Sequence, residues 1–127
     1  MDRPKILVIG SMNMDLVTTT STFPKPGETL MGKSFSTIPG GKGANQAVAA
    51  SRLGADVTFA GCVGDDLFGE TLIENLTKNN VNSRFVTKIN EVETGVAAIT
   101  IAESDNQIIV VPGANDHVTP AFIEQHE

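Results

Sequence analysis

A run of apolar residues close to the N-terminus, KILVIG from Lys5 to Gly10, places the strongest constraint on the fold. The run is continuous rather than alternating, and a glycine ends it. This pattern is typical of a strand that is buried on both faces of a parallel sheet. The sequence therefore predicts that a parallel sheet starts at this run and that its faces are covered by other elements.

A helix and a second buried strand are expected next. Residues 43–53 (GANQAVAASRL) are followed by Gly54, a residue suited to a helix C-terminus. Small residues dominate the helical stripe and predict close packing: Ala44, Ala47, Val48 and Ser51. Residues 56–63 are again continuously apolar after the first positions, so they predict a second buried strand.

The same alternation continues with a second helix and a third strand. Asp65 and Asp66 stand at the head of this helix, Asn79 and Asn80 close it, and its apolar face is made of Phe68, Leu72, Ile73 and Leu76. A strand over residues 85–89 follows. At 127 residues and 40% hydrophobic content, the chain can bury one core. The alternation favours a single-domain α/β fold of stacked layers with right-handed crossovers.

Two segments, residues 16–38 and 95–112, do not follow this alternation of strands and helices. The first contains strand-prone threonines, a Pro-Lys-Pro-Gly turn and an alternating stretch, and the second has apolar stretches around a Ser-Asp-Asn-Gln turn. Both are typical of β-ribbons, which often form a flap or accessory sheet over a site. The alternative is that they extend the main sheet. After Thr119, Pro120 predicts the first turn of a further helix.

Charge and hydropathy argue against several classes of partner. The net charge of -6 and the pI near 4.8 argue against nucleic-acid binding, which depends on Lys and Arg. No stretch of eighteen or more apolar residues is present, and the N-terminal run is too short for a signal peptide. The sequence therefore predicts no membrane partner and a cytoplasmic location. Cys62 is the sole cysteine, and its apolar neighbours predict a buried thiol.

Residues 27–34, GETLMGKS, match the Walker A pattern of phosphate-binding loops letter for letter. A phosphate-binding loop requires a buried strand before the glycines and a helix that opens at the Lys-Ser pair. Two prolines precede this segment, and the alternating residues 35–38 after it predict a strand. We therefore do not interpret it as a nucleotide site.

The segment GSMNMD, residues 10–15, follows the first predicted strand directly. Asn13 and Asp15 are thus expected at the carboxyl end of a parallel sheet, where ligands usually bind. In an extended segment both side chains point to one side. An amide beside a carboxylate suits a polyol, because both accept hydroxyl protons and the amide also donates. The alternative is an Asx turn or a helix cap.

Three glycines in GGKGANQ, residues 40–46, stand directly before the first predicted helix. Glycines let the backbone approach a ligand closely, and Lys42 and Asn45 would then point toward it. The alternative is a flexible connection, because the stretch lacks a phosphate-loop signature.

These segments together resemble the N-terminal part of the ribokinase group of PfkB-type carbohydrate kinases. The resemblance rests on GSMNMD, FPKPGET, GGKGANQAVAASRLGA, GCVGDDLFGE, Thr94-Gly95 and PGAN in that order, and it covers essentially all 127 residues. It implies a ribokinase-like layered α/β sheet whose two β-ribbons form a small lid. It also implies a set of residues that contact the ribose hydroxyls: Asn13, Asp15, Gly41, Lys42 and Asn45.

The resemblance further implies ATP-dependent phosphorylation of D-ribose at its 5-hydroxyl, with Mg²⁺ and K⁺ as cofactors and a homodimer that pairs through the lids. No Gly-Ala-Gly-Asp segment is present to supply the family's catalytic aspartate and anion hole, and residues 113–116 (GAND) belong by position to another stretch. The ligands of ATP, Mg²⁺ and K⁺ are therefore expected beyond residue 127, and the chain resembles a truncated kinase without its nucleotide-binding half. Deoxyribose, fructose or a nucleoside as substrate, or a non-catalytic sugar-binding or dimerisation fragment, remain alternatives.

Overall fold

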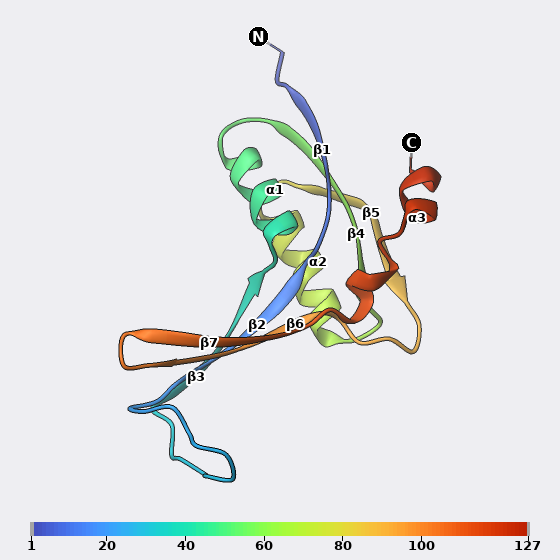
Figure 1. Cartoon of the computed structure of the whole chain (residues 1–127). Helices are drawn as coiled ribbons and strands as arrows, with labels where there is room; N and C mark the ends of the chain where they lie inside the picture. Colours follow the sequence, from blue (N-terminus) through green and yellow to red (C-terminus); the bar gives the residue numbers. More distant parts are fainter. Residues whose placement is uncertain (1, 127) are drawn as a thin grey trace.

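The computed structural model of the chain describes residues 2–126. The strands form two separate sheets, one of three strands and one of four. We call them the body sheet and the ribbon sheet. Figure 1 shows the helices gathered around the body sheet, whereas the ribbon sheet extends away from them.

The body sheet consists of β1 (Lys5–Ile9), β4 (Asp56–Gly64) and β5 (Asn82–Ile89), which are parallel and lie in the order β1-β4-β5. Helix α1 (Lys42–Arg52) precedes β4, and helix α2 (Leu67–Lys78) connects β4 to β5. The alternation of strands and helices predicted from the sequence is thus confirmed. Gly54 has φ +101° directly after α1, as expected of a glycine that ends a helix.

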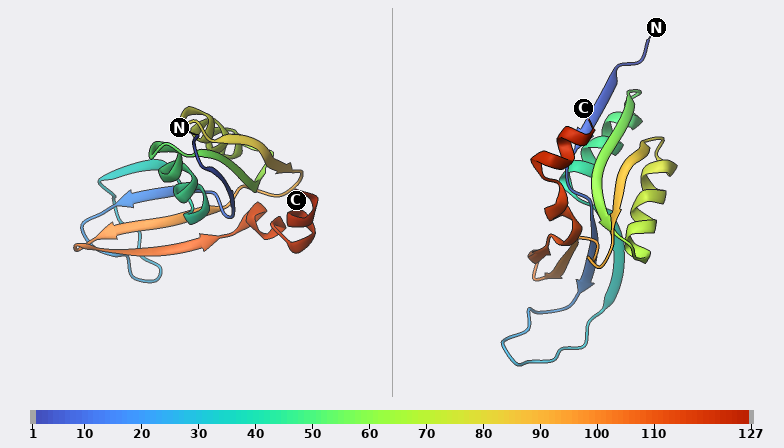
Figure 2. Two further views of the ribbon diagram at one scale, coloured as in Figure 1. Left: turned by 90° about the horizontal axis from the view of Figure 1, so that it is seen from above. Right: turned by 90° about the vertical axis from the view of Figure 1, so that its right-hand side faces the viewer.

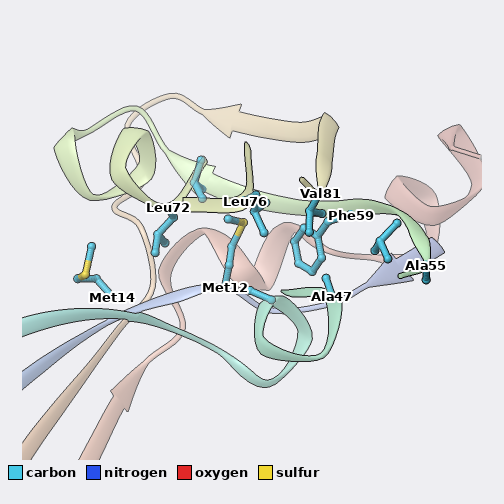
Figure 3. Close-up of a cluster of buried hydrophobic side chains, with 11 residues drawn as sticks. Met12, Met14, Ala47, Ala55, Phe59, Leu72, Leu76 and Val81 are labelled. Atoms are coloured by element: carbon cyan, nitrogen blue, oxygen red, sulfur yellow. The ribbon is translucent and has the colours of Figure 1, made fainter. Parts of the chain in front are cut away.

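The central strand β4 separates two apolar clusters. Val57, Phe59 and Val63 are fully buried in the larger cluster with residues of both helices, and Figure 3 shows Phe59, Leu72 and Leu76 within it. Ala60 and Cys62 belong to a second cluster with residues of the 3-10 helix η1 (Gly113–His117) and of α3 (Pro120–Gln125). Residues alternate across a strand, so the clusters cover opposite faces of the sheet. The layered α/β prediction and the buried Cys62 are confirmed.

Strand β1 differs from the prediction that KILVIG is buried on both faces. Ile6 and Leu7 are 38% and 47% exposed, and only the carboxyl half of the strand is partly buried. The reason is that β1 is an edge strand, which pairs only with β4 among the described strands, and that neither apolar cluster includes Ile6 or Leu7. An open cavity of about 480 Å³ lies there, lined by Leu7, Thr58, Phe85 and their neighbours.

The ribbon sheet has the strand order β3-β2-β6-β7. Its strands are β2 (Asn13–Thr19), β3 (Ser34–Gly40), β6 (Val96–Ala102) and β7 (Asp105–Val111). The outer pairs are antiparallel ribbons, and a parallel pairing of β2 with β6 joins them. The left view of Figure 2 shows the four strands side by side. The predicted accessory sheet is confirmed, and the alternative that the ribbons extend the main sheet is wrong.

Two details of the ribbons differ from the sequence-based expectation. The first ribbon begins at Asn13 and ends at Gly40, so it is longer than residues 16–38. The turn of the second ribbon lies at Glu103 and Ser104, not over residues 104–107. Both turn residues have positive φ, 53° and 60°, which matches the twist of a tight two-residue hairpin. No Asn-Gly or Asp-Gly signal marked that position in the sequence.

The Walker-like segment is part of the connection between β2 and β3. The Lys25 carbonyl accepts a hydrogen bond from the Glu28 N–H (2.9 Å), which closes a turn in which Gly27 has φ +78°. Ser34 begins strand β3 rather than a helix. The interpretation that residues 27–34 do not form a nucleotide-binding loop is therefore confirmed. Among residues 2–126, none of the helices is long and apolar enough to cross a membrane.

Candidate functional site

The junction between β1 and the ribbon sheet carries the candidate site. Met12 and Met14 are 0% and 2% exposed, and Figure 3 shows both side chains in the apolar cluster. Because β2 begins at Asn13 and side chains alternate along a strand, Asn13 and Asp15 lie on the opposite face from Met14. The two methionines of GSMNMD therefore anchor the segment in the core and direct the amide and the carboxylate away from it.

Asn13 and Asp15 lie in a strand of the ribbon sheet, one short connection beyond the end of β1. The extended conformation expected of Asn-x-Asp is confirmed. Neither side chain caps a helix or closes a turn among the described hydrogen bonds, so the Asx-turn alternative is wrong. The Asn13 Oδ1 atom accepts a hydrogen bond from Nδ2 of Asn115 in η1 (2.7 Å).

The Asp15 carboxylate lies against the backbone of β3. A Cβ atom at Gly40 would stand 2.6 Å from Asp15 Oδ2, so only glycine leaves room for the carboxylate there. Burial raises the pKa of Asp15 above its ordinary value. No hydrogen bond to this carboxylate is found from residues 2–126, and it is half-buried. A desolvated carboxylate without a partner is an acceptor available to a ligand.

Gly41 lets the start of α1 touch the Ser11–Met12 backbone. It has φ +97°, and a Cβ there would lie 2.8 Å from Met12 Cα and 2.9 Å from the Ser11 carbonyl oxygen. The Ser11 carbonyl also accepts a hydrogen bond from the Ala44 N–H in the first turn of α1 (3.0 Å). The glycine-rich stretch is therefore a close backbone contact, not a flexible connection.

The structure brings Asn13, Asp15 and Gly41 together, since Gly41 contacts the Asn13 backbone and its neighbour Gly40 contacts Asp15. Lys42 and Asn45 lie in the first turn of α1, and both are exposed. Among the described hydrogen bonds, the side chains of these two residues make none. They therefore border the junction without being fixed to Asn13 or Asp15.

Three residues of the junction were not identified as site residues from the sequence: Gly40, Gly95 and Asn115. Gly95 makes room for two amides, because a Cβ there would overlap Asn115 Nδ2 and lie 2.6 Å from Asn13 Oδ1. The PGAN segment was visible as a pattern, but its contact with Asn13 spans 102 positions. The local periodicity of a sequence cannot indicate a contact between residues so far apart along the chain.

The junction presents a donor and an acceptor on one face of a strand, an arrangement suited to neighbouring hydroxyl groups. The described residues do not fit a nucleotide, because the Walker-like segment enters a strand and the GAND segment forms a 3-10 helix. Within residues 2–126 no three side chains of His, Cys, Asp or Glu gather to hold a metal ion.

Comparison with known proteins gives the family. Residues 3–127 match the model of a family described as pfkB family carbohydrate kinase. Ribokinase of Bacillus subtilis (strain 168) is 55% identical over 117 residues, which are 92% of this chain and 40% of that protein. Deoxyribokinase of Salmonella typhi is 44% identical over 121 residues, which are 94% of this chain and 40% of that protein.

A solved structure supports the same relationship. The structure of Arabidopsis thaliana ribokinase complexed with ribose and ATP superimposes with a TM-score of 0.81 at 36% sequence identity, over 91% of this chain and 38% of the other. The chain thus spans about 40% of the length of the curated relatives named above. Since the family model matches residues 3–127, the chain belongs to the pfkB family of carbohydrate kinases.

Proposed function

We propose that Asn13, Asp15, Gly41, Lys42 and Asn45 bind D-ribose, as the sugar-binding part of an intact ATP-dependent kinase that phosphorylates the 5-hydroxyl. The observation that carries this proposal is the half-buried Asp15 carboxylate, which no described residue pairs, beside the fixed amide of Asn13. The likeness to ribokinases over about 40% of their length supports it.

Each residue has a separate role in the proposal. The Asp15 carboxylate accepts hydrogen bonds from sugar hydroxyls, and the Asn13 amide donates one. The close approach at Gly41 brings the start of α1 against the Ser11–Asn13 backbone, next to the two polar groups. Lys42 and Asn45, exposed on the first turn of α1, reach the sugar from its open side. Together these contacts hold the sugar so that its reacting hydroxyl meets groups that lie outside these 127 residues.

ATP, Mg²⁺ and K⁺ belong to the proposed intact enzyme, which we place in the cytoplasm. When bound, they supply the transferred phosphoryl group and the charge that stabilises it. The present chain contributes to that reaction by binding and orienting the sugar. The two β-ribbons, over about residues 16–38 and 95–112 in the sequence-based expectation, form the proposed lid.

Deoxyribose is the second candidate substrate, because the deoxyribokinase of Salmonella typhi is 44% identical to the chain. The two sugars differ by one hydroxyl, and a site whose buried polar group bonds that hydroxyl rejects the analogue that lacks it. Fructose and nucleosides are the further alternatives within the family, and a sugar-binding module without catalysis is the alternative outside it.

Calorimetric titration and a phosphorylation assay test the proposal together. The intact protein is expected to bind D-ribose more tightly than deoxyribose, fructose or a nucleoside, and to form ribose 5-phosphate from ATP. The 127-residue chain alone is expected to form no product. Absence of ribose binding by the intact protein contradicts the sugar site, and binding without turnover favours the non-catalytic module. Robust activity of the 127-residue chain alone contradicts the proposal that the catalytic groups lie outside it.

We propose that two copies of the protein pair through their lids. The strand register places a row of apolar residues on the same face of the ribbon sheet as Asp15: Val17, Ile38, Ile99, Ile108 and Val110. Ile108 and Val110 are 52% and 55% exposed. An exposed apolar face that continues from a binding site is a typical dimer surface. Its pairing with a second copy would shield the sugar from water.

Ile108→Asp should weaken the dimer about 100-fold or more, because a carboxylate buried in an apolar interface loses its hydration without a partner. Ile109→Asp is the matched control, since Ile109 is 69% exposed but lies on the opposite face of β7. Sedimentation velocity of the intact protein at several concentrations measures the effect. A monomeric parent protein, or a loss of dimer in Ile109→Asp alone, contradicts the proposed pairing.

A further inference from the structure

The side chain of Asn115 connects η1 to the junction through three hydrogen bonds. Its Oδ1 accepts from the Met12 N–H (3.0 Å), and its Nδ2 donates to the Met12 carbonyl (3.1 Å) and to Asn13 Oδ1 (2.7 Å). One amide therefore satisfies both backbone groups of a residue that is 0% exposed. The third hydrogen bond of Asn115 goes to Asn13, whose side chain we propose to bind the sugar.

The direction of each bond follows from the Met12 backbone. A backbone N–H can only donate, so it requires the oxygen of the Asn115 amide. The Asn115 nitrogen then faces the Met12 carbonyl and Asn13, and a nitrogen with two protons can only donate. The Asn13 oxygen must therefore face Asn115, because the flipped amide would oppose two donors. This leaves the Asn13 NH₂ group free to donate elsewhere.

Several features keep Asn115 in this place. Ala114 is fully buried, and its N–H donates to the Glu93 carbonyl (2.8 Å). Gly113 has φ +53°, and a Cβ there would overlap the same Glu93 carbonyl. Gly95 provides the space that the two amides occupy. The segment after the second ribbon is thus shaped to hold one amide against the start of the first ribbon.

We propose that Asn115 is a positioning residue that fixes Asn13 as a hydrogen-bond donor to the sugar. The inference rests on the proposed sugar site and adds a direction to it: the Asn13 amide donates while the Asp15 carboxylate accepts. The ligand atom that meets Asn13 must then be an acceptor, such as the lone pair of a hydroxyl whose own proton goes to Asp15. Asn115 itself does not touch the sugar.

A double-mutant cycle on D-ribose binding by the intact protein tests this inference. Asn115→Asp keeps an oxygen for the Met12 N–H but replaces the donor to Asn13 with a second acceptor. The Asn13 amide then turns its NH₂ group toward position 115 and presents its oxygen, rather than a donor, to the sugar. We expect Asn115→Asp to raise the Kd for ribose about tenfold in the parent protein, the value of about one hydrogen bond. In the Asn13→Ala background, the same change should raise Kd less than about twofold. Calorimetry measures the parent protein and the three variants.

The control is Asn82→Asp, the same chemical change at an exposed residue of β5 whose Oδ1 accepts from the Arg84 N–H. It should leave Kd unchanged. An equal effect of Asn115→Asp in both backgrounds shows that Asn115 acts only on the fold and overturns the inference. An unchanged Kd in Asn13→Ala overturns it as well, but leaves the Asp15 part of the sugar site intact. No ribose binding by the parent protein overturns the proposed function itself.

A measurement on the parent protein covers the case in which Asn115→Asp does not fold. The side-chain NH₂ resonances of Asn13, assigned by their loss in Asn13→Ala, should shift strongly as ribose is added. Those of Asn115 should shift little, since Asn115 donates to Met12 and Asn13 in both states. A large shift at Asn115 with none at Asn13 contradicts the proposed direction of the bond.

Discussion

Asp15→Asn is expected to weaken D-ribose binding by about 100-fold or more, without loss of stability. Hydrogen bonds to a charged acceptor contribute about 1.5–3 kcal/mol each, and two hydroxyl contacts would be weakened together. The folded chain offers the carboxylate no hydrogen-bond partner among the described residues, so the neutral amide removes a desolvated charge. The free energy of unfolding should therefore stay the same or rise. Calorimetric titration and chemical denaturation measure the two effects.

The pH dependence of Asp15 follows from the same burial. Its pKa is raised in the folded chain, so the folded state holds the proton more tightly than the unfolded state does. Ionisation of Asp15 therefore lowers the free energy of unfolding at pH values above the raised pKa. This loss of stability disappears as the pH falls through the raised pKa toward the pKa of the unfolded chain. Ribose affinity should decrease as the pH falls through the raised pKa, because a protonated carboxyl accepts hydroxyl protons poorly. The pH dependence of ribose binding should be weaker in Asp15→Asn.

Asp56→Asn is the matched control for this prediction. Asp56 is an exposed carboxylate at the amino end of β4, so the change removes the same charge far from the junction. It should alter neither ribose affinity nor its pH dependence. Equal affinity of Asp15→Asn and the parent protein contradicts the sugar site at this residue. A marked loss of stability in Asp15→Asn shows that the carboxylate has a structural partner.

Asp66→Ala is expected to lower the free energy of unfolding of the intact protein by about 3 kcal/mol, with a corresponding decrease in Tm. Asp66 caps α2 by accepting from the Gly69 N–H (2.8 Å). It also accepts from the Thr94 N–H (2.9 Å) and from the Thr94 hydroxyl (2.6 Å). Thr94 is 1% exposed, so alanine at position 66 leaves a buried N–H without its partner. Thermal and denaturant unfolding measure the loss.

The pKa of Asp66 gives this prediction a pH window. Burial opposes its ionisation, but the hydrogen bonds from Thr94 and Gly69 outweigh burial and lower the pKa below its ordinary value. The stabilisation by Asp66 is at its maximum at pH values above the pKa that this carboxyl has in the unfolded chain. It decreases as the pH falls through the lower pKa that the carboxyl has in the folded chain. The difference between the parent and Asp66→Ala should shrink in that acidic range.

Asp65→Ala is the control, because Asp65 is the exposed neighbour of Asp66 and carries the same charge. Its removal should change the free energy of unfolding by less than about 0.5 kcal/mol. Similar losses in both variants would show that net charge, rather than the hydrogen bonds to Thr94, stabilises this end of α2.

The local elements could be predicted because each depends on its own residues. The alternation in GSMNMD is an example: two apolar and two polar side chains in turn define the buried and open faces of an extended segment. The glycine after α1 likewise marks the end of that helix by itself. These patterns gave the order of strands and helices, the separate ribbons, and the face on which Asn13 and Asp15 lie.

Features that depend on distant partners could not be predicted. The apolar run of β1 is consistent with burial on both faces, but its exposure depends on how far the elements packed on each face reach over the sheet. The role of Asn115 depends on its distance from Met12, and that distance is set by two ribbons in between. Its side chain alone is compatible with a cap, a turn or the surface.

The parallel pairing of β2 with β6 has a consequence for synthesis on the ribosome. Strand β6, the parallel partner of β2, is complete only about sixty residues after the first ribbon ends at Gly40, on the order of 3–12 s at usual rates of translation. During that interval the first ribbon is an isolated two-stranded hairpin with an open edge, which is marginally stable in water. A nascent chain of this length is therefore a natural client for ribosome-associated chaperones until the second ribbon emerges.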